Sequence, residues 1–439
     1  MAQAEIGAIE RATLRTVTWR ILPFLMLAYF VAFVDRVNAG FAALQMNQDI
    51  GLSPAQFGLG GGLFYVSYVL CEVPSNVAME RFGARIWLAR IMITWGLVSA
   101  GMAFVVGPVS FYAVRLLLGA AEAGFFPGVI LYLTYWYPRA YRGRIVAIFM
   151  VAIPISSFLG SPLSAWLLGT NGMLGFRGWQ WLFLIEAVPA VLLGILAFVL
   201  LPDGPARASW LTPQQRAWLT ERLADDRASV VEGAGRPAGH LSLRQVMTNR
   251  YVLAASLIYA GASGASQCLS LWQPQIIKSF GLTNLETGLL NAIPFGIASV
   301  LMIVWGRSSD RRRERVWHTA LPLGLLAASL AASLLTSQLW PTILILCLAI
   351  TATYTVKGPF WALSTEWLSA GAAAAGIAQI NAIGNIGGFL GTYLLGIIKD
   401  ATGSYPLGLM PLVILSAIGC ALVLGLGKAK SPAPAPARA

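Results

Sequence analysis

The chain has 439 residues, of which 57% are hydrophobic and 11% are charged, and its formal net charge is +12. Soluble domains are about 45 to 50% apolar and about 25% charged, so this composition excludes a soluble globular protein and indicates an integral membrane protein. The positive net charge is compatible with a nucleic-acid partner, but the positions of the basic residues argue against one.

Apolar runs of about 20 residues, long enough to span a bilayer, occur twelve times in the chain. We predict spans near 19–41, 55–79, 86–106, 109–136, 144–169, 179–201, 251–279, 285–305, 316–336, 340–367, 372–398 and 406–427. The first run is too long for the apolar core of a signal peptide, and no cleavage site of small residues follows it. We therefore expect it to remain as a membrane span.

The thirty lysines and arginines are distributed unevenly between the two sides of the predicted spans. Twenty-four lie at the start of the chain, in every second loop or at the span ends that border it, or in the tail; three lie on the opposite side, and Arg36, Arg115 and Lys357 lie well inside spans. By the positive-inside rule, both termini are predicted to be cytoplasmic. This one-sided distribution favours a membrane protein with no nucleic-acid partner.

A polar segment divides the spans into two sets of six. We predict an N-terminal six-helix bundle at 1–202, a cytoplasmic linker at 203–250, a C-terminal six-helix bundle at 251–427 and a disordered cytoplasmic tail at 428–439. In the linker, Thr212-Pro213-Gln214-Gln215 contains an N-cap, a proline at the first helical position and a capping-box glutamine. It predicts a short amphipathic helix, with Trp218, Leu219 and Leu223 on one side, that lies along the membrane surface.

Residues that commonly carry catalysis or bind cofactors are scarce. The four cysteines lie in apolar runs without paired spacing, there are two histidines, and neither a Walker-type motif nor a nucleophile elbow occurs. We therefore expect no enzymatic activity, no metal site and no cofactor.

The loops after the second and eighth spans share a pattern. Each has an acid–arginine pair followed by a second arginine: Glu80-Arg81 with Arg85, and Asp310-Arg311 with Arg315. The offset between the loops, 230 residues, is close to the offset between the first and seventh spans. Either loop alone is explained as a run of charged residues that face water. The matched positions of the charges in the two loops, however, indicate two repeated halves, as in many secondary transporters.

The second loop, Gly306-x-x-x-Asp310-Arg311-x-x-x-Arg315, resembles the cytoplasmic signature of the major facilitator superfamily, and the loop from Asn76 to Arg85 is a variant of it. The chain as a whole resembles the anion:cation symporter family, which includes bacterial permeases for sugar acids, tartrate, phthalate and hydroxyphenylacetate and is related to sialin and the vesicular glutamate transporters. The stretches that carry this resemblance are Asp35-Arg36-Val37-Asn38-Ala39-Gly40, Val73-Pro74-Ser75-Asn76, Arg115–Gly128, Trp179–Pro189, Gly358-Pro359-Phe360-Trp361 and Asn385–Phe389.

The resemblance implies an all-α fold of two six-helix bundles in the bacterial inner membrane. It also implies a monomeric symporter that imports a small organic carboxylate with protons as the coupling ion, by alternating access. Sugar acids, dicarboxylates and aromatic acids all fit. The runner-up interpretation is a proton-driven exporter of drugs or amphiphiles from the same superfamily, which three cationic residues within spans do not favour.

Four charged residues lie within the first and fourth spans. Arg115 and Glu122 are seven residues apart, so they share one helix face about 10 Å apart along the axis. A charge inside a membrane helix costs at least about 2.5 to 3.5 kcal/mol, so such residues face polar partners or a water-filled cavity. Asp35 and Arg36 point about 100° apart. In one consistent arrangement Asp35 turns toward Arg115 and Glu122, while Arg36 faces the central cavity.

The resemblance implies that Asp35 and Glu122 carry protons and that the arginines bind the anion or couple it to protons. Because arginine matches a carboxylate bidentately, we predict Arg36 first, and Arg115 second, as the substrate-binding cation. The alternative for Asp35 and Glu122 is a charge-balanced contact between helices that does not titrate in function.

Other polar residues within spans are weaker candidates. Lys357, which is outside the family pattern, shares a face with Tyr354 and Trp361 and either receives a second carboxylate or pairs with Glu366. Tyr68 matches a family position that faces substrate, and three further residues are predicted to contact substrate: Gln267, Asn381 and Asn385. Polar residues also join membrane helices to one another, so a structural role stays open for each of them.

The predicted gate consists of Glu72 and the charged residues of the two signature loops. These loop residues are Glu80, Arg81, Arg85, Asp310, Arg311 and Arg315. Glu186, in the sixth span, is interpreted as structural.

Overall fold

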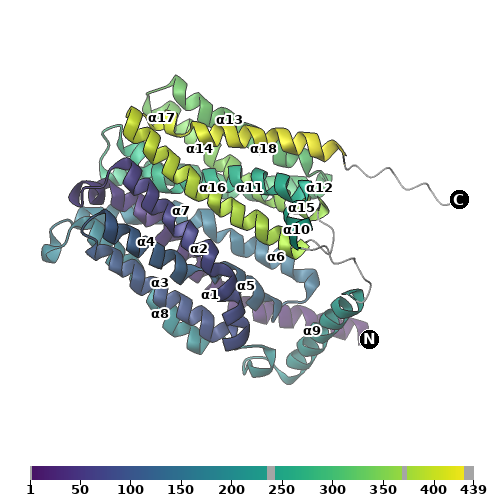
Figure 1. Ribbon diagram of the computed structural model, residues 1–439. Helices are drawn as coiled ribbons and strands as arrows, with labels where there is room; N and C mark the ends of the chain where they lie inside the picture. Colours follow the sequence, from purple (N-terminus) through teal and green to yellow (C-terminus); the bar gives the residue numbers. More distant parts are fainter. Residues whose placement is uncertain (1, 235–242, 368–372, 430–439) are drawn as a thin grey trace. The chain divides into compact units, whose positions relative to one another are not determined.

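A computed structural model describes residues 2–234, 243–367 and 373–429, and within these ranges helices are the only regular secondary structure (Figure 1). Within them, twelve helical segments are long and apolar enough to cross a membrane. They are Gly7–Asp49, Pro54–Phe82, Ala84–Phe104, Pro108–Thr134, Arg139–Thr170, Gly178–Leu200, Arg250–Lys278, Asn284–Arg312, Val316–Leu335, Leu339–Trp367, Ala375–Thr402 and Met410–Gly427. The predicted number and order of the spans are confirmed.

The chain forms two compact units, Met1–Ile50 with Val66–Ala238, and Gly51–Tyr65 with Gly239–Ala439. The helices up to the linker are α1 (Ala2–Asp49), α2 (Pro54–Phe82), α3 (Ala84–Gly101), α4 (Pro108–Glu122), α5 (Phe125–Thr134), α6 (Arg139–Met150), α7 (Ala152–Leu167), α8 (Gly178–Leu200) and α9 (Pro213–Ala234). Those after it are α10 (Leu243–Met247), α11 (Arg250–Lys278), α12 (Asn284–Arg312), α13 (Val316–Ala332), α14 (Leu339–Thr355), α15 (Lys357–Trp367), α16 (Ala373–Thr402), α17 (Tyr405–Gly408) and α18 (Met410–Ala429). Short 3-10 segments occur at η1 (Met102–Phe104), η2 (Leu168–Thr170), η3 (Met173–Gly175), η4 (Pro205–Arg207) and η5 (Ser333–Leu335).

The start of α2 belongs to the second unit because its glycines allow close approach to α11 and α16. A Cβ atom on Gly58 would lie 2.6 Å from the Thr392 carbonyl oxygen, and one on Gly62 would lie 2.5 Å from the Phe389 ring. Small residues allow membrane helices to pack at short distances. The second unit therefore includes part of the second span as well as the C-terminal spans.

Glycines also line the main helix contacts inside each unit. In the first unit α3 packs along α8, where a Cβ atom on Gly194 would lie 3.0 Å from the Ala89 carbonyl oxygen. In the second unit α11 packs along α16, where a Cβ atom on Gly264 would lie 2.8 Å from the Gly387 carbonyl oxygen. These contacts fix the faces that each helix turns toward its neighbours.

The predicted linker helix is confirmed as α9. Its N-terminus has the predicted capping box, since the Thr212 hydroxyl accepts from the Gln215 backbone N–H at 3.2 Å and the Gln215 side chain accepts from the Thr212 N–H at 3.1 Å. Leu219 and Leu223 are buried, and α9 packs against α1 and η4, so protein covers part of its apolar side. The predicted position along the membrane surface stays a prediction.

The C-terminal helix α18 runs to Ala429. The predicted tail at 428–439 therefore begins two residues inside a helix, and its remaining residues lie outside the described ranges.

Candidate functional site

The fourth span is broken directly after Glu122. Helix α4 ends at Glu122, Gly124 adopts a left-handed conformation with φ of 86°, and α5 begins at Phe125. Arg115 and Glu122 are each 3% exposed. The predicted shared face is confirmed, and the break leaves the Glu122 carboxyl group at the end of a helix.

Glu122 forms an ion pair with Arg36 of α1. The Arg36 Nε–H donates to Glu122 Oε1 at 2.6 Å, and Arg36 Nη2 lies 2.5 Å from the same oxygen. The guanidinium group also lies over the rings of Phe33 and Tyr68, at 4.8 and 5.3 Å from their centroids. Arg115 is close enough to attract the Glu122 carboxylate electrostatically. Arg36, Arg115, Tyr68 and Glu122 therefore form one cluster.

The Arg36 side chain is only partly enclosed in this cluster. It is 23% exposed, whereas the Glu122 side chain is 4% exposed. Arg36 is therefore the more accessible member of a largely buried ion pair, and aromatic rings flank its guanidinium group.

Asp35 faces the opposite way, toward α3. Its carboxylate accepts hydrogen bonds from Trp95 Nε1 at 2.7 Å, from Ser99 Oγ at 2.9 Å and from Asn38 Nδ2 at 3.0 Å. The arrangement expected from the sequence is thus wrong, because Arg36 and not Asp35 contacts Glu122. Trp95 and Ser99 are four residues apart on one face of α3, and this donor pair was the sequence signal that we missed.

We expect Gly124→Ala to lower the stability of the protein by about 1 to 3 kcal/mol, since a side chain is strained in the left-handed region. An added Cβ atom would also lie 2.3 Å from Ser75 Oγ. Thermal unfolding of the purified protein in detergent measures the effect. The control is Gly143→Ala in α6, where no atom lies within 4 Å of an added Cβ; equal melting temperatures for the two variants would contradict the prediction.

Lys357 lies next to a slight irregularity of the tenth span. Helix α14 ends at Thr355 and α15 begins at Lys357, but Val356 between them keeps helical dihedral angles, with φ of −66° and ψ of −30°, so the span continues. The Lys357 ammonium group lies 3.5 Å from Ser266 Oγ and 4.3 Å from the centroid of the Tyr354 ring. The predicted common face of Lys357 and Tyr354 is confirmed.

Two predicted residues of the second unit are joined by a hydrogen bond between α11 and α16. Gln267 Nε2 donates to Asn385 Oδ1 and to Ser263 Oγ, each at 3.1 Å. A Cβ atom on Gly388 would lie 1.4 Å from Gln267 Oε1, so a glycine at this position makes room for the amide. Asn381, half-buried, lies one turn before Asn385 on α16.

The two signature loops form different ion pairs. Arg315 Nη1 lies 2.7 Å from Asp310 Oδ1 and donates to Ser309 Oγ at 2.7 Å. In the first loop, by contrast, Arg85 Nη2 lies 3.5 Å from Asp203, beyond the sixth span. Three other loop residues are exposed, namely Glu80, Arg81 and Arg311, and Glu72 is half-buried. The gating role of these residues stays a prediction.

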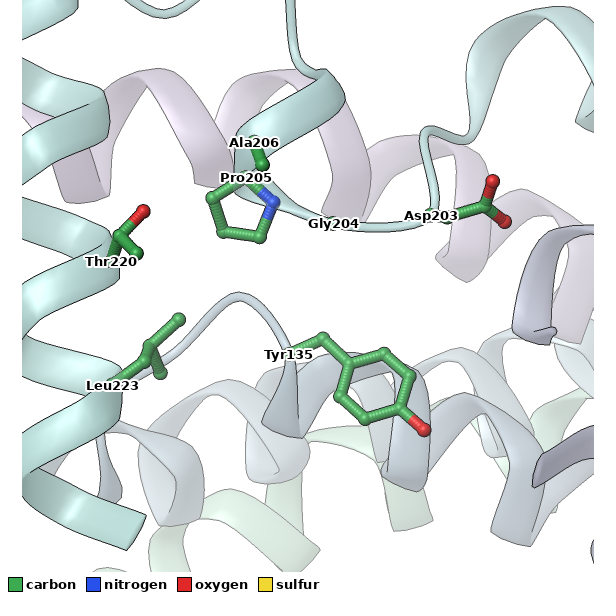
Figure 2. A pocket seen from close by; sticks show the side chains of 7 residues that line it. All are labelled: Tyr135, Asp203, Gly204, Pro205, Ala206, Thr220 and Leu223. Atoms are coloured by element: carbon green, nitrogen blue, oxygen red, sulfur yellow. The ribbon is translucent and has the colours of Figure 1, made fainter. Parts of the chain in front are cut away.

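A cavity of about 330 Å³ lies between α9, η4 and Tyr135 (Figure 2). Thr220 and Leu223 line it from α9, and Asp203–Ala206, which lead into η4, line it from the other side. The Asp203 carboxylate accepts from Arg207 Nη1 at 2.9 Å, in addition to its pairing with Arg85. None of the residues predicted for substrate or proton binding lines this cavity, so we assign it no part in transport.

The family model described as Major Facilitator Superfamily matches residues 25–392. The chain belongs to this superfamily. It is 48% identical over 413 residues to a "Putative tartrate transporter" of Agrobacterium vitis, covering 93% of this chain and 91% of that protein. It is 39% identical to a "Quinolone resistance transporter" of Acinetobacter baumannii, covering 94% of each chain.

Among solved structures, the chain resembles a bacterial homologue of the human lysosomal transporter Spinster in an inward-facing and occupied conformation. The TM-score is 0.76 at 17% identity, and the match covers 94% of this chain and 98% of that one. This likeness shows the shared fold. The chain is therefore a membrane transporter and not an enzyme, and it is a multi-pass protein of the inner membrane.

Proposed function

We propose that the chain is a proton-coupled symporter that imports a small organic carboxylate by alternating access. The observation that carries the proposal is the Arg36–Glu122 ion pair, in which a partly exposed arginine is bound to a buried acid. A guanidinium group matches a carboxylate whether that carboxylate belongs to the protein or to a substrate. The substrate and Glu122 therefore compete for the same cation.

This competition couples the substrate to a proton. When Glu122 is protonated it no longer attracts Arg36 strongly, and the guanidinium group is available for the substrate carboxylate. When Glu122 loses its proton, its carboxylate recaptures Arg36 and displaces the substrate. Burying an arginine without any anion costs free energy. This cost disfavours the state in which Arg36 binds neither Glu122 nor the substrate carboxylate.

Asp35 is the second proposed proton carrier. Its three hydrogen-bond donors stabilise the ionised form without a cation in direct contact. If both acids carry protons with a monoanion, each cycle moves net positive charge inward. The membrane potential then contributes about 2.3 kcal/mol per charge per 100 mV, which favours import.

A dicarboxylate is the substrate class that we favour, and Lys357 is the proposed second cation. The relative named for tartrate supports this class. The break next to Glu122 and the slight helix irregularity next to Lys357 are separated by about the same number of residues as the two signature loops, so Lys357 occupies the position in the second half that corresponds to Glu122 in the first. The relative named for quinolone resistance supports the alternative, a drug exporter.

We expect Lys357→Ala to weaken dicarboxylate binding by about tenfold to a hundredfold, because one charge-assisted contact is lost. Binding of monocarboxylates is expected to stay unchanged. Titration of the purified protein with a panel of monocarboxylates, dicarboxylates and cationic dyes measures both effects.

The matched control is Lys399→Ala, because the Lys399 ammonium group also lies over a tyrosine ring, at 4.1 Å from the centroid of Tyr405. Equal losses for monocarboxylates and dicarboxylates would remove Lys357 from a second-carboxylate site. Binding of cationic dyes, with no carboxylate bound, would favour the exporter.

A further inference from the structure

Ser75, near the end of α2, contacts the break in the fourth span. It is 6% exposed. The break ends at Gly124, whose φ of 86° is left-handed. A Cβ atom on Gly124 would lie 2.3 Å from Ser75 Oγ and 2.6 Å from Ser75 Cβ, so the Ser75 side chain packs directly against the backbone of the break. Both residues belong to the first unit.

A hydrogen bond from α3 holds the Ser75 hydroxyl group. Trp87 Nε1 donates to Ser75 Oγ at 3.0 Å. The Trp87 ring is itself held in place, because Phe82 stacks on it with the ring centroids 5.6 Å apart and the Arg90 guanidinium group lies 4.0 Å from its centroid. The first signature loop, from Asn76 to Arg85, joins the two hydrogen-bonded residues along the chain. The bond therefore closes the loop at its base, and a rearrangement of the loop acts on Ser75.

The second signature loop is closed by a bond of the same kind. Trp305 Nε1 of α12 donates to the His318 carbonyl oxygen of α13 at 2.9 Å, and these residues lie on either side of the loop from Gly306 to Arg315. Trp305 follows Ser75 by 230 residues, the same offset as that between the two loops. The closing bond is thus repeated in the two halves, and in the first half its acceptor is the residue that contacts the break.

The position of the Glu122 carboxyl group depends on the backbone that Ser75 contacts. Glu122 is the last residue of α4, and Ala123, with φ of −55° and ψ of 133°, leaves the helical conformation directly after it. A change in the dihedral angles of Ala123 and Gly124 redirects the end of α4 and moves Glu122 relative to Arg36. The hydrogen bond between Arg36 and Glu122 is charge-assisted, and its strength depends steeply on distance and angle.

We propose that Ser75 is a positioning residue that links the first signature loop to Glu122. While Trp87 holds the hydroxyl group, Ser75 keeps the break in the conformation in which Glu122 meets Arg36. When the loop rearranges during the transport cycle, Ser75 moves, the break relaxes and the ion pair weakens. Arg36 then becomes available to the substrate. The proposal rests on the proposed function of Glu122.

The first test is independent of transport and follows hydrogen–deuterium exchange of the backbone amides at 123–126 in the purified protein. Trp87→Phe keeps an aromatic ring but removes the indole N–H. We expect exchange at the break to become about twofold to tenfold faster, the factor that corresponds to the loss of one hydrogen bond. Ser75→Ala should have the same effect, and the double variant should add nothing, since both changes remove one bond. Unchanged exchange in both single variants would overturn the link.

The matched control for Trp87→Phe is Trp181→Phe. The Trp181 indole N–H donates to the Met173 carbonyl oxygen at 2.9 Å, and its ring centroid lies 5.6 Å from that of Phe176. This variant should leave exchange at the break unchanged, and so should Arg90→Lys, which keeps a cation over the Trp87 ring. If Trp181→Phe increased exchange at the break as much as Trp87→Phe does, the specific link through Ser75 would be contradicted.

The second test is the pH dependence of substrate binding to the purified Ser75→Ala variant, with tartrate as the probe. The charged or titratable groups that face Glu122 are Arg36 and Asp35 of α1, Tyr68 of α2 and Arg115 of α4. The variant leaves all of them in place. A weaker ion pair favours the protonated form of Glu122, so tartrate should bind up to a higher pH. We expect the midpoint of the binding curve to move up by about 0.3 to 1 unit, the size of one hydrogen bond.

The Glu122→Gln background separates positioning from a general structural role. In this background, Ser75→Ala should cause no change in the pH dependence of tartrate binding. A shift that persists there, or an unchanged midpoint for Ser75→Ala alone, would overturn the positioning role. Tartrate binding that is independent of pH in the unaltered protein would instead contradict the proposed role of Glu122 in proton coupling, while the exchange measurement would still report whether Ser75 holds the break.

Discussion

Glu122→Gln is expected to abolish uphill uptake while exchange of labelled substrate across the membrane continues. Glutamine cannot release a proton and cannot recapture Arg36 as an anion, so substrate binding no longer depends on the proton gradient. For a monoanion carried with two protons, the single net positive charge at 100 mV corresponds to an accumulation of about fiftyfold, from about 2.3 kcal/mol. A dicarboxylate carried with two protons moves no net charge, so the pH gradient alone drives its accumulation. We expect this accumulation to fall to equilibrium in the variant, as measured with labelled substrate in proteoliposomes.

The control for this experiment is Glu221→Gln, which removes a carboxylate from an exposed position on α9. It should accumulate substrate as the unaltered protein does. If Glu122→Gln lost exchange and accumulation alike, Glu122 would be required for binding or folding, and its role in proton coupling would be contradicted.

Arg36→Lys is expected to weaken carboxylate binding by about thirtyfold to a hundredfold. Lysine keeps the positive charge but loses the planar fork that holds a carboxylate with two parallel bonds, a difference of about 2 to 3 kcal/mol. Lysine is preferable to alanine here, because removing the cation would leave Glu122 buried without a partner at a cost of about 3 to 5 kcal/mol. Titration of purified protein with the transported carboxylate measures the affinity.

Arg90→Lys is the matched control for Arg36→Lys. Its guanidinium group also lies over an aromatic ring, at 4.0 Å from the centroid of Trp87, and it is not part of the proposed site. Affinity close to that of the unaltered protein is expected for this variant. If Arg36→Lys also bound normally while Arg115→Lys did not, Arg115 would be the anion-binding residue.

The spans were predictable because a membrane helix has a fixed minimum length and a strong composition signal. The shared face of Arg115 and Glu122 was predictable for a similar reason, since helical periodicity alone places residues seven apart on one side. Burial of both side chains bears this out.

The orientation of Asp35 and Arg36 was not predictable from the same rules. Periodicity fixes the angle between two neighbours on a helix but not the rotation of that helix against the rest of the bundle. The donors Trp95 and Ser99 decide the rotation, and their contribution depends on tertiary packing. The same limit applies to α9, whose buried leucines face α1 and η4.

The break in the fourth span had only a partial signal in the sequence. The stretch contains glycine and proline, which membrane helices also tolerate without breaking. The left-handed conformation of Gly124 and its close contact with Ser75 became visible only in three dimensions. A residue beside such a break is a stronger candidate for function than its polarity alone suggests.

Uptake into proteoliposomes under an imposed proton gradient tests proton-coupled carboxylate import most directly. Sugar acids, dicarboxylates and aromatic carboxylates are each supplied with an inward gradient, and the gradient is then collapsed with a proton carrier. The account predicts that one carboxylate class, dicarboxylates first, accumulates above equilibrium and is released when the gradient collapses. Expulsion of cationic dyes with no accumulation of any carboxylate would contradict it.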